Sequence, residues 1–374
     1  AANNALHGKT RKEHIGQVEE LMAQLDAKAT AVDATRAARI AAAKAQLEKH
    51  LFMLESGPTG DGISNAVIAN ATGCSSVYSS TFPFNPYKAP WVNSLFQDTP
   101  AVAKGIFEGV AADVLDDYKA VRIAELELAD AYDPAVHDKY FRTFNWEQFS
   151  ETELARLPTI FSIGGDGATY DIGFGALSRL LATHTPIKVV VVNTGVYSNT
   201  GGQASTSTLI GQDSDLARFG AAHQGKTDSR KELGLIASFH PHVMVVQTAT
   251  PMQGHFLKHV LAALSRTNSP AVIDVYTPCQ GEQGITDDVS NEHARLAVES
   301  RTSPLYVHNP DGGASLKERF SVEGNPDAEQ DWTTLVLSYK DADGNEQTKE
   351  VALTPAHFAH KEGRFKKAFT GQPL

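Results

Sequence analysis

The chain has 374 residues, a net charge of −11, 41% hydrophobic residues and 21% charged residues. These values are ordinary for a globular protein of one or two domains, and no apolar stretch approaches the length that crosses a bilayer, so a membrane protein is excluded. The acidic balance, without a cluster of Lys and Arg, excludes nucleic acid as a partner. Two distant cysteines, Cys74 and Cys279, favour a reducing, cytoplasmic compartment over a disulfide framework.

Residues 11–54 are rich in Ala, Leu, Glu, Lys and Gln, and their apolar residues return every three or four positions. This pattern predicts two amphipathic helices with a docking or scaffolding role, because catalytic residue types are not concentrated there. The first residues lack both Met and the layout of a signal peptide, which indicates a fragment or a processed chain. We expect residues 1–58 to form a helical arm or an insertion.

Short runs rich in β-branched residues follow at 66–71, 159–163, 187–193, 243–249 and 271–276. Their continuous apolarity indicates strands covered on both faces, and helical patterns at 171–184 and 253–266 separate the later runs. The predicted fold class is α/β, with a doubly wound, mostly parallel sheet in a domain of residues 59–310. An acidic, helix-like stretch at 101–157 is interpreted as an insertion over the sheet.

Residues 311–374 are predicted to form a C-terminal extension that contains a β-hairpin. Two runs of strand-forming residues, 333–340 and 347–354, flank DADGNE, whose Asp-Gly pair is typical of a hairpin turn. The segment EGRFKKAF at 362–369 predicts a short basic helix.

A glycine-rich segment follows the strand at 159–163, in the sequence GGDGATYDIGFG. Gly164, Gly165 and Gly167 allow a tight turn and let a phosphate approach the helix that follows. Asp166 would then lie beside a diphosphate. A carboxylate in that position can hold a divalent cation such as Mg²⁺, which usually has few protein ligands besides phosphate oxygens and water.

The next strand ends in Asn193 and Thr194, one helix and one strand after Asp166. In a parallel βαβ unit this arrangement returns the chain to the same edge of the sheet, where ligands bind in open α/β folds. A second oxygen ligand and a backbone carbonyl from this segment could therefore complete a metal shell around Asp166.

Gly-Asp-Gly followed by Asn at this separation is the signature of thiamine diphosphate enzymes, and the resemblance extends further. Five segments match in order: ANATGCSS (69–76), WVNSLFQD (91–98), GGDGATYDIGFGAL (164–177), NTGVYSNTGGQAST (193–206) and YTPC (276–279). Together they resemble the thiamine domain of pyruvate:ferredoxin (flavodoxin) oxidoreductases. The resemblance covers most of residues 60–310 and implies a thiamine diphosphate-binding fold.

The resemblance also implies ligands for thiamine diphosphate and Mg²⁺. Asp166, the hydroxyl of Thr194 and the carbonyl of Val196 would hold Mg²⁺, whereas the general thiamine pattern would make Asn193 the ligand. Asn199 would be the catalytic residue that reaches toward the reacting carbon and the substrate. The implied cofactor-binding residues are Gly73, Cys74, Ser75, Gly165, Asp166, Gly167, Thr194, Val196, Tyr197 and Asn199.

Cys74 and Cys279 match two of the four thiolates that hold a [4Fe–4S] cluster in this family, and four are the usual requirement. The family's Cys-x-x-Cys, expected upstream of Cys74, is absent. Either the missing pair lies before Ala1, with residues 1–60 as an insertion, or this homologue has lost the cluster. The family also commonly has an acidic residue where this chain has Gly195.

The resemblance implies that the chain is part of a 2-oxoacid oxidoreductase, with pyruvate as the expected substrate. Electrons would pass through iron–sulfur clusters to ferredoxin or flavodoxin, and coenzyme A would take the acyl group. Further expected partners are the other domains or subunits of the enzyme, including the pyrimidine-side thiamine domain, in a homodimer or larger assembly. This chain alone is expected to be inactive. The alternatives are a non-oxidative thiamine enzyme, such as a carboligase, and a non-catalytic scaffolding subunit.

Overall fold

The computed structural model describes residues 2–79, 87–214 and 225–369. By internal contacts the chain divides into a helical unit, of residues 1–68, 87–90 and 103–160, and a sheet unit, of residues 69–86, 91–102 and 161–374. No helix among the described residues is long and apolar enough to cross a membrane. The predicted domain boundaries at residues 58 and 310 cut the chain into consecutive segments, whereas each of these two units combines separate segments. Those boundaries stay a prediction.

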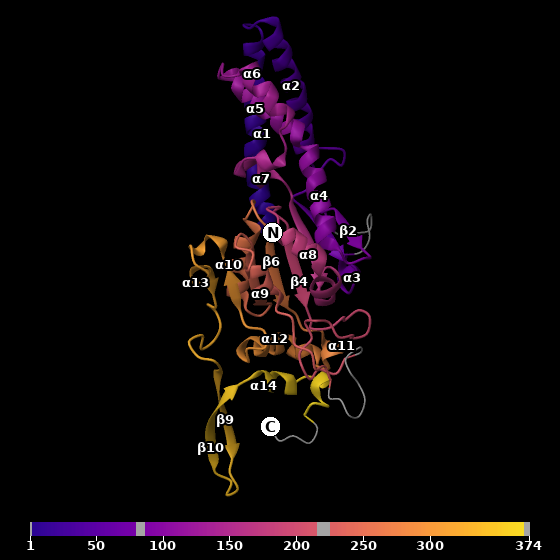
Figure 1. Ribbon diagram of the computed structural model, residues 1–374, viewed down its shortest axis with the longest axis vertical. Coiled ribbons are helices and arrows are strands. Elements are labelled where there is room, and N and C mark those ends of the chain that lie inside the picture. Colours follow the sequence, from indigo (N-terminus) through magenta and orange to yellow (C-terminus); the bar gives the residue numbers. More distant parts are fainter. Residues whose placement is uncertain (1, 80–86, 215–224, 370–374) are drawn as a thin grey trace. The chain divides into compact units, whose positions relative to one another are not determined.

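Two long helices form the arm of the helical unit, as predicted (Figure 1). They are α1 (Ala2–Ala29) and α2 (Ala34–Glu55), and they pack against each other. Asp33 begins α2, because its carboxylate accepts hydrogen bonds from the first free N–H groups of that helix. Apolar residues at helical spacing, such as Leu25 and Leu47, are fully buried between the helices.

The stretch predicted as an insertion is helical. Its helices are α4 (Thr99–Asp113), α5 (Leu115–Leu128), α6 (Pro134–Arg142) and α7 (Glu151–Arg156), with a 3-10 turn η1 (Trp146–Gln148) before α7. Ala120, Val121 and Ala124 of α5 are buried in the same apolar cluster as α1 and α2. The buried face of α5 therefore packs within the helical unit, and the placement of this stretch over the sheet stays a prediction. Its apolar stripe predicted a buried face but not the partner of that face.

The larger sheet has eight strands within the described residues, in the order β2-β1-β3-β4-β6-β5-β7-β8. These strands are β1 (Ala66–Ala71), β2 (Trp91–Ser94), β3 (Thr159–Gly165), β4 (Lys188–Asn193), β5 (Met244–Ala249), β6 (Ala271–Tyr276), β7 (Tyr306–His308) and β8 (Phe320–Ser321). Strands β3, β4, β6 and β5 are parallel neighbours, and β7 and β8 continue the sheet antiparallel. The mostly parallel α/β fold class is confirmed.

Helices connect and cover these strands (Figure 1). They are α3 (Ser75–Ser79), α8 (Phe174–Leu181), α9 (Leu233–Ser238), α10 (Gln253–Leu264), α11 (Gln280–Gln283), α12 (Ser290–Glu299), α13 (Leu316–Arg319) and α14 (Pro355–His360). Every residue of β5 and β6 is buried, so both faces of these strands are covered, as their continuous apolarity predicted. Met244 and Val246 meet Ala263 of α10 on one of these faces.

The predicted hairpin is present as β9 (Thr333–Lys340) and β10 (Glu346–Leu353), paired antiparallel. Gly344 in its turn has a φ of +84°, a conformation that glycine adopts without strain. The basic helix predicted at 362–369 is wrong, because the chain forms only the 3-10 turn η5 (Gly363–Phe365) there. Arg364 in this turn is buried instead of exposed to solvent.

Candidate functional site

The candidate site lies where β3 and β4 end. Gly164 pairs with Val191 and Gly165 pairs with Val192, so Asp166 and Asn193 leave the sheet at the same level. After Asp166 the chain enters a π-helical turn, η2 (Gly167–Ile172), and then α8. Ligands of open α/β sheets bind at the carboxyl ends of the strands, which is the edge that these residues occupy.

Three oxygen-bearing groups meet at this edge. The Oγ1 atom of Thr194 lies 3.1 Å from Oδ1 of Asp166 and 3.1 Å from the carbonyl oxygen of Val196. Two ligands at right angles around Mg²⁺, at its usual bond length of about 2.1 Å, are about 3 Å apart. The distances from the Thr194 hydroxyl to the other two predicted ligands therefore each fit adjacent positions of an octahedral Mg²⁺ shell.

Asp166 is the buried carboxylate of this group. Its relative exposure is 1%, and burial raises its pKa to about 6, against the effect of hydrogen bonds from Ser205 and from the N–H and hydroxyl of Thr194. A buried carboxylate without a cation is costly, so a positive charge beside Asp166 would stabilise its ionised form. Sequence reasoning missed Ser205, although it lies inside the segment 193–206 that carries the resemblance.

Asn193, the alternative metal ligand, directs its side chain into the protein core. Its Nδ2 donates to the hydroxyl of Tyr170 at 3.0 Å, and its Oδ1 accepts from Ser207 at 2.8 Å and from the N–H of Gly195 at 3.2 Å. The hydroxyl of Tyr170 donates in turn to the buried Asp274. Because the polar atoms of Asn193 are engaged in this network, the geometry favours Thr194 as a metal ligand.

A cavity of about 160 Å³ lies beside Asp166, and every residue predicted to bind the cofactor lines it, from Gly73 to Asn199. Gln97 and Ser198 also line it and were not predicted. The side-chain amide of Gln97 donates to the carbonyl of Thr72 at 3.1 Å, and the hydroxyl of Ser198 lies 2.8 Å from that of Thr194. Both residues are inside matched segments, so the same resemblance could have indicated them.

Gly167 and Tyr197 form one wall of the cavity. A Cβ atom on Gly167 would lie 2.2 Å from the ring of Tyr197, so the close packing requires glycine. The hydroxyl of Tyr197 lies within hydrogen-bond distance of the carbonyl of Gly167, at 3.1 Å, and of the carboxylate of Asp171, at 3.2 Å. Burial, followed by the charge of Asp171, raises the pKa of Tyr197 above its usual range, so the phenol stays protonated.

Asn199 and the exposed Cys74 line the same cavity, whereas Cys279 is not among its lining residues. The thiol of Cys74 lies 3.7 Å from Oδ1 of Asn199. Burial raises the pKa of the Cys74 thiol, and the charges of Cys279 and Glu282 raise it further. Among the described residues, no three His, Cys, Asp or Glu side chains gather as a metal site.

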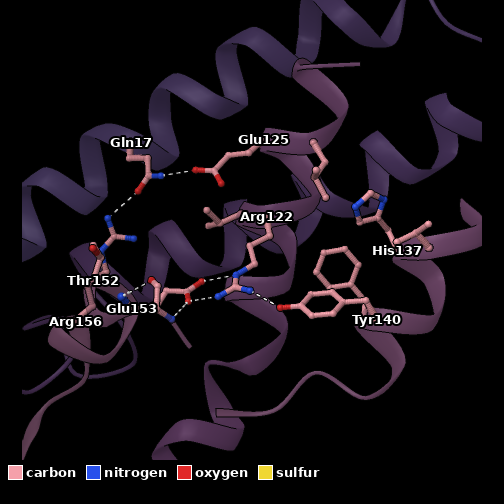
Figure 2. Close-up of a pocket in the computed structure, with 13 residues that line it drawn as sticks. Gln17, Arg122, Glu125, His137, Tyr140, Thr152, Glu153 and Arg156 are labelled. Atoms are coloured by element: carbon pink, nitrogen blue, oxygen red, sulfur yellow. Dashed lines mark hydrogen bonds and ion pairs between the residues drawn. The ribbon is translucent and has the colours of Figure 1, made fainter. Parts of the chain in front are cut away.

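A larger cavity, of about 720 Å³, belongs to the helical unit (Figure 2). Arg122 is held there by the carboxylate of Glu153 and by the hydroxyl of Tyr140, and Gln17 accepts a hydrogen bond from Arg156. None of the residues predicted from the sequence as site residues lines this cavity. We therefore place the candidate site at the smaller cavity beside Asp166.

Comparison with known proteins defines the class of this chain. Residues 152–275 match the family model described as the C-terminal TPP binding domain of thiamine pyrophosphate enzymes. This match contains Asp166 and Thr194 together with the strands that carry them. The fold and the matched segment thus define a thiamine diphosphate-binding domain.

Individual relatives match a longer part of the chain. A probable pyruvate-flavodoxin oxidoreductase of Escherichia coli strain K12 is 31% identical over 310 residues, which cover 76% of this chain and 26% of that protein. The pyruvate:ferredoxin oxidoreductase of Moorella thermoacetica is 31% identical over 316 residues, which cover 74% of this chain and 26% of that protein. The pyruvate dehydrogenase [NADP(+)] of Cryptosporidium parvum is 28% identical over 378 residues, 82% of this chain and 18% of that protein.

This chain is a homologue of the pyruvate:ferredoxin (flavodoxin) oxidoreductases and contains their thiamine diphosphate-binding domain. It spans about a quarter of the length of the first two relatives. A solved 2-oxoglutarate:ferredoxin oxidoreductase from Magnetococcus marinus overlaps with a TM-score of 0.38 and 15% identity, over 60% of this chain and 58% of that one, too weakly to add to this assignment.

Proposed function

We propose that this chain supplies the diphosphate- and magnesium-binding side of a thiamine diphosphate site in a 2-oxoacid oxidoreductase that uses pyruvate. The observation that carries the proposal is the group of oxygens from Asp166, Thr194 and Val196, spaced for Mg²⁺ at the sheet edge. The names of the relatives support the reaction and the substrate. Because this chain covers only part of those proteins, the complete activity requires further domains or subunits.

The residues around the cavity fit the diphosphate end of the cofactor. Asp166, Thr194 and Val196 would hold Mg²⁺, and the diphosphate oxygens would complete its shell. Gly165 leaves room for phosphate at the start of the helical turn, where free backbone N–H groups favour an anion, and Gly167 leaves room for the ring of Tyr197. Gly73, Cys74 and Ser75 line the cavity at the start of α3.

Thiamine diphosphate, when bound, supplies a carbon nucleophile and an electron sink for the decarboxylation of 2-oxoacids. The chain's own residues position that chemistry. Asp166, once ionised, fixes the metal, and the protonated phenol of Tyr197 closes one wall against water. The amide of Asn199, near Cys74, is proposed to contact the substrate.

Cys74 and Cys279 are proposed as two of the four ligands of a [4Fe–4S] cluster. The chain contains no other cysteine, so its residues alone do not fit a complete cluster, and the other thiolates must come from elsewhere in the oxidoreductase. Ferredoxin or flavodoxin is the proposed electron acceptor, by analogy with the names of the relatives. Coenzyme A as the acyl acceptor rests on the family resemblance.

Oxidative turnover tests the proposal. The full-length protein, purified anaerobically with the subunits that accompany it, is expected to reduce methyl viologen when pyruvate, coenzyme A, thiamine diphosphate and Mg²⁺ are present. Asp166→Ala should lower the rate at least about 100-fold, because the metal loses its charged ligand. Equal rates for the two proteins would contradict the assigned site.

The two alternative functions predict different results in the same preparation. Release of carbon dioxide from pyruvate without viologen reduction, in protein that lacks iron and has no visible absorbance from a cluster, would identify a non-oxidative thiamine enzyme. Failure to bind thiamine diphosphate at all would identify a scaffolding subunit. Either result would overturn the proposed oxidoreductase function.

A further inference from the structure

The C-terminal extension places a charged group inside the sheet unit. Glu362 and Arg364 flank Gly363 at the turn η5, and their side chains are 0% and 4% exposed. Sequence patterns predicted a basic, solvated helix at this position. Instead, this Arg and this Glu form a buried ion pair, because charged side chains are buried only when they are paired.

A third side chain, that of His293, joins this pair. The Nε atom of Arg364 donates to Oε2 of Glu362, and its Nη2 donates to Oε1 at 3.3 Å. The ring nitrogen Nε2 of His293, which is also buried, lies 2.7 Å from Oε1 of Glu362. The imidazole of His293 stacks on Phe358 of α14, with ring centroids 4.5 Å apart. These contacts fix the plane of Glu362 and hence the orientation of the guanidinium.

The free end of this guanidinium reaches the candidate metal loop. The Nη1 atom of Arg364 donates to the carbonyl oxygen of Thr194 at 3.2 Å, and the amide of Gln283 approaches the same oxygen at 3.4 Å. The backbone carbonyl of Arg364 accepts from the N–H of Asp213 at 2.7 Å, which anchors the turn on a second segment. The C-terminal extension thus binds the backbone of a candidate metal ligand.

This contact acts on a flexible point of the loop. Gly195 follows Thr194 with a φ of +71°, and the two Nη atoms of Arg364 lie 3.6 Å from where a Cβ of residue 195 would be. Glycine allows many backbone conformations, and the peptide between Thr194 and Gly195 is held by its N–H on Oδ1 of Asn193 and by its carbonyl on Arg364 and Gln283. Loss of the Arg364 contact would leave this carbonyl only the longer contact with Gln283, so the backbone that carries Thr194 and Val196 would be freer to shift out of register with Asp166.

We propose that Arg364 is a positioning residue for the Mg²⁺ site: by holding the Thr194 carbonyl, it keeps the Thr194 hydroxyl and the Val196 carbonyl directed toward Asp166. The inference rests on the proposed function, because it assigns a role to Arg364 only if these oxygens bind a metal. Groups that orient metal ligands typically contribute about 10- to 100-fold to metal affinity. The C-terminal extension is therefore part of the cofactor site although it lines no part of the cavity.

The test compares two double variants of the full-length protein. Arg364→Met with Glu362→Gln removes the donor to Thr194 and leaves no unpaired buried charge. The matched control, Arg230→Met with Glu232→Gln, removes another Arg–Glu pair two residues apart, whose Nη1 donates to the carbonyl of Thr302 at 2.9 Å. The apparent Mg²⁺ affinity at saturating thiamine diphosphate and the melting temperature of the ligand-free protein are measured for each.

We expect the Arg364 double variant to bind Mg²⁺ about tenfold or more weakly than wild type, and the Arg230 control to stay within about twofold, at similar losses of melting temperature. Equal Mg²⁺ affinity for wild type and the Arg364 variant, or equal loss in both variants, would overturn the inference. Absence of Mg²⁺-dependent binding by the wild type would instead refute the proposed function.

A milder variant decides the question if the double variant fails to fold. Arg364→Lys keeps the buried positive charge, but one ammonium cannot replace the planar guanidinium that contacts Glu362 and Thr194 together. We expect it to fold and to weaken Mg²⁺ binding about three- to tenfold. Wild-type Mg²⁺ affinity in Arg364→Lys would contradict the positioning role.

Discussion

At the scale of single residues, Asp166 sets the pH range in which the site can work. Its burial raises the pKa to about 6, and Mg²⁺ binds the carboxylate rather than the carboxylic acid. We expect the apparent Mg²⁺ affinity to fall about tenfold for each pH unit below 6 and to be constant above about pH 7. Calorimetric titrations between pH 5 and pH 8 measure this profile, and a flat profile would contradict the assignment of Asp166 as a ligand.

The same carboxylate is expected to destabilise the protein without metal. A carboxyl group whose folded pKa lies above its unfolded value stabilises the fold at pH values below the unfolded pKa, and this contribution is lost as the pH rises through about 6. Asp166→Asn should therefore raise the unfolding free energy at pH 8 by about 1 to 3 kcal/mol and have little effect at pH 4. Urea denaturation at both pH values checks this, and a loss of stability at pH 8 would disagree with the raised pKa.

Gly167 gives a steric prediction with a control nearby. A methyl group at Gly167 would overlap the ring of Tyr197, whereas at Gly175 in α8 a Cβ would have no heavy atom within 4 Å. Gly167→Ala should destabilise the protein by about 1 to 3 kcal/mol and weaken cofactor binding. Gly175→Ala should stabilise it by about 0.5 to 1 kcal/mol, because alanine favours the helix. Similar effects of both changes would refute the close packing against Tyr197.

The candidate site illustrates what can be predicted from residues alone. Asp166 and Thr194 were predictable from their places in the chain. Asp166 lies in a glycine-rich turn after one strand, and Thr194 follows the next parallel strand, so both must lie at the same edge of the sheet. Ser205 and Arg364 were not predictable, because neither has a local pattern that shows which way its side chain points. Arg364 in particular reaches the site from the far end of the chain.

At the scale of elements, prediction succeeded where the pattern was long or fully apolar. The strands β4, β5 and β6 and the helices α1 and α2 lie where their periodicity placed them. The strands β2, β7 and β8 were missed, since runs of two to four residues carry too few positions to show a period. The hairpin β9–β10 was found from its turn sequence.

Packing within the helical unit also gives a prediction at this scale. Leu47 is fully buried in the cluster formed by α1, α2 and α5, whereas Met53 in the same helix is 39% exposed. Leu47→Ala should destabilise the unit by about 2 to 5 kcal/mol through a cavity, and Met53→Ala should change its stability by less than about 1 kcal/mol. Chemical denaturation followed by circular dichroism compares the two. Comparable losses would show that the core of this unit lies elsewhere.

At the scale of the whole molecule, the chain combines a thiamine diphosphate-binding sheet unit with a helical unit that none of the site residues belongs to. The matched segments cover about a quarter of the length of the first two relatives. The sequence predicted the cofactor class because Asp166 and Thr194, the proposed metal ligands, follow the two strands of one βαβ unit. The function of the helical unit could not be predicted, since an amphipathic pattern shows which face of a helix is buried but not what the helix binds.

Calorimetric titration of the full-length protein, with any copurifying subunits, by thiamine diphosphate tests the central claim most directly. With Mg²⁺ present we predict one binding event per chain. Chelation of Mg²⁺ and the substitution Asp166→Ala should each lower the affinity for thiamine diphosphate at least about 100-fold. Chelation should not lower the affinity of the Asp166→Ala variant any further, because both changes remove the same metal. Binding that is unaffected by both changes would show that Asp166, Thr194 and Val196 do not form a metal–diphosphate site.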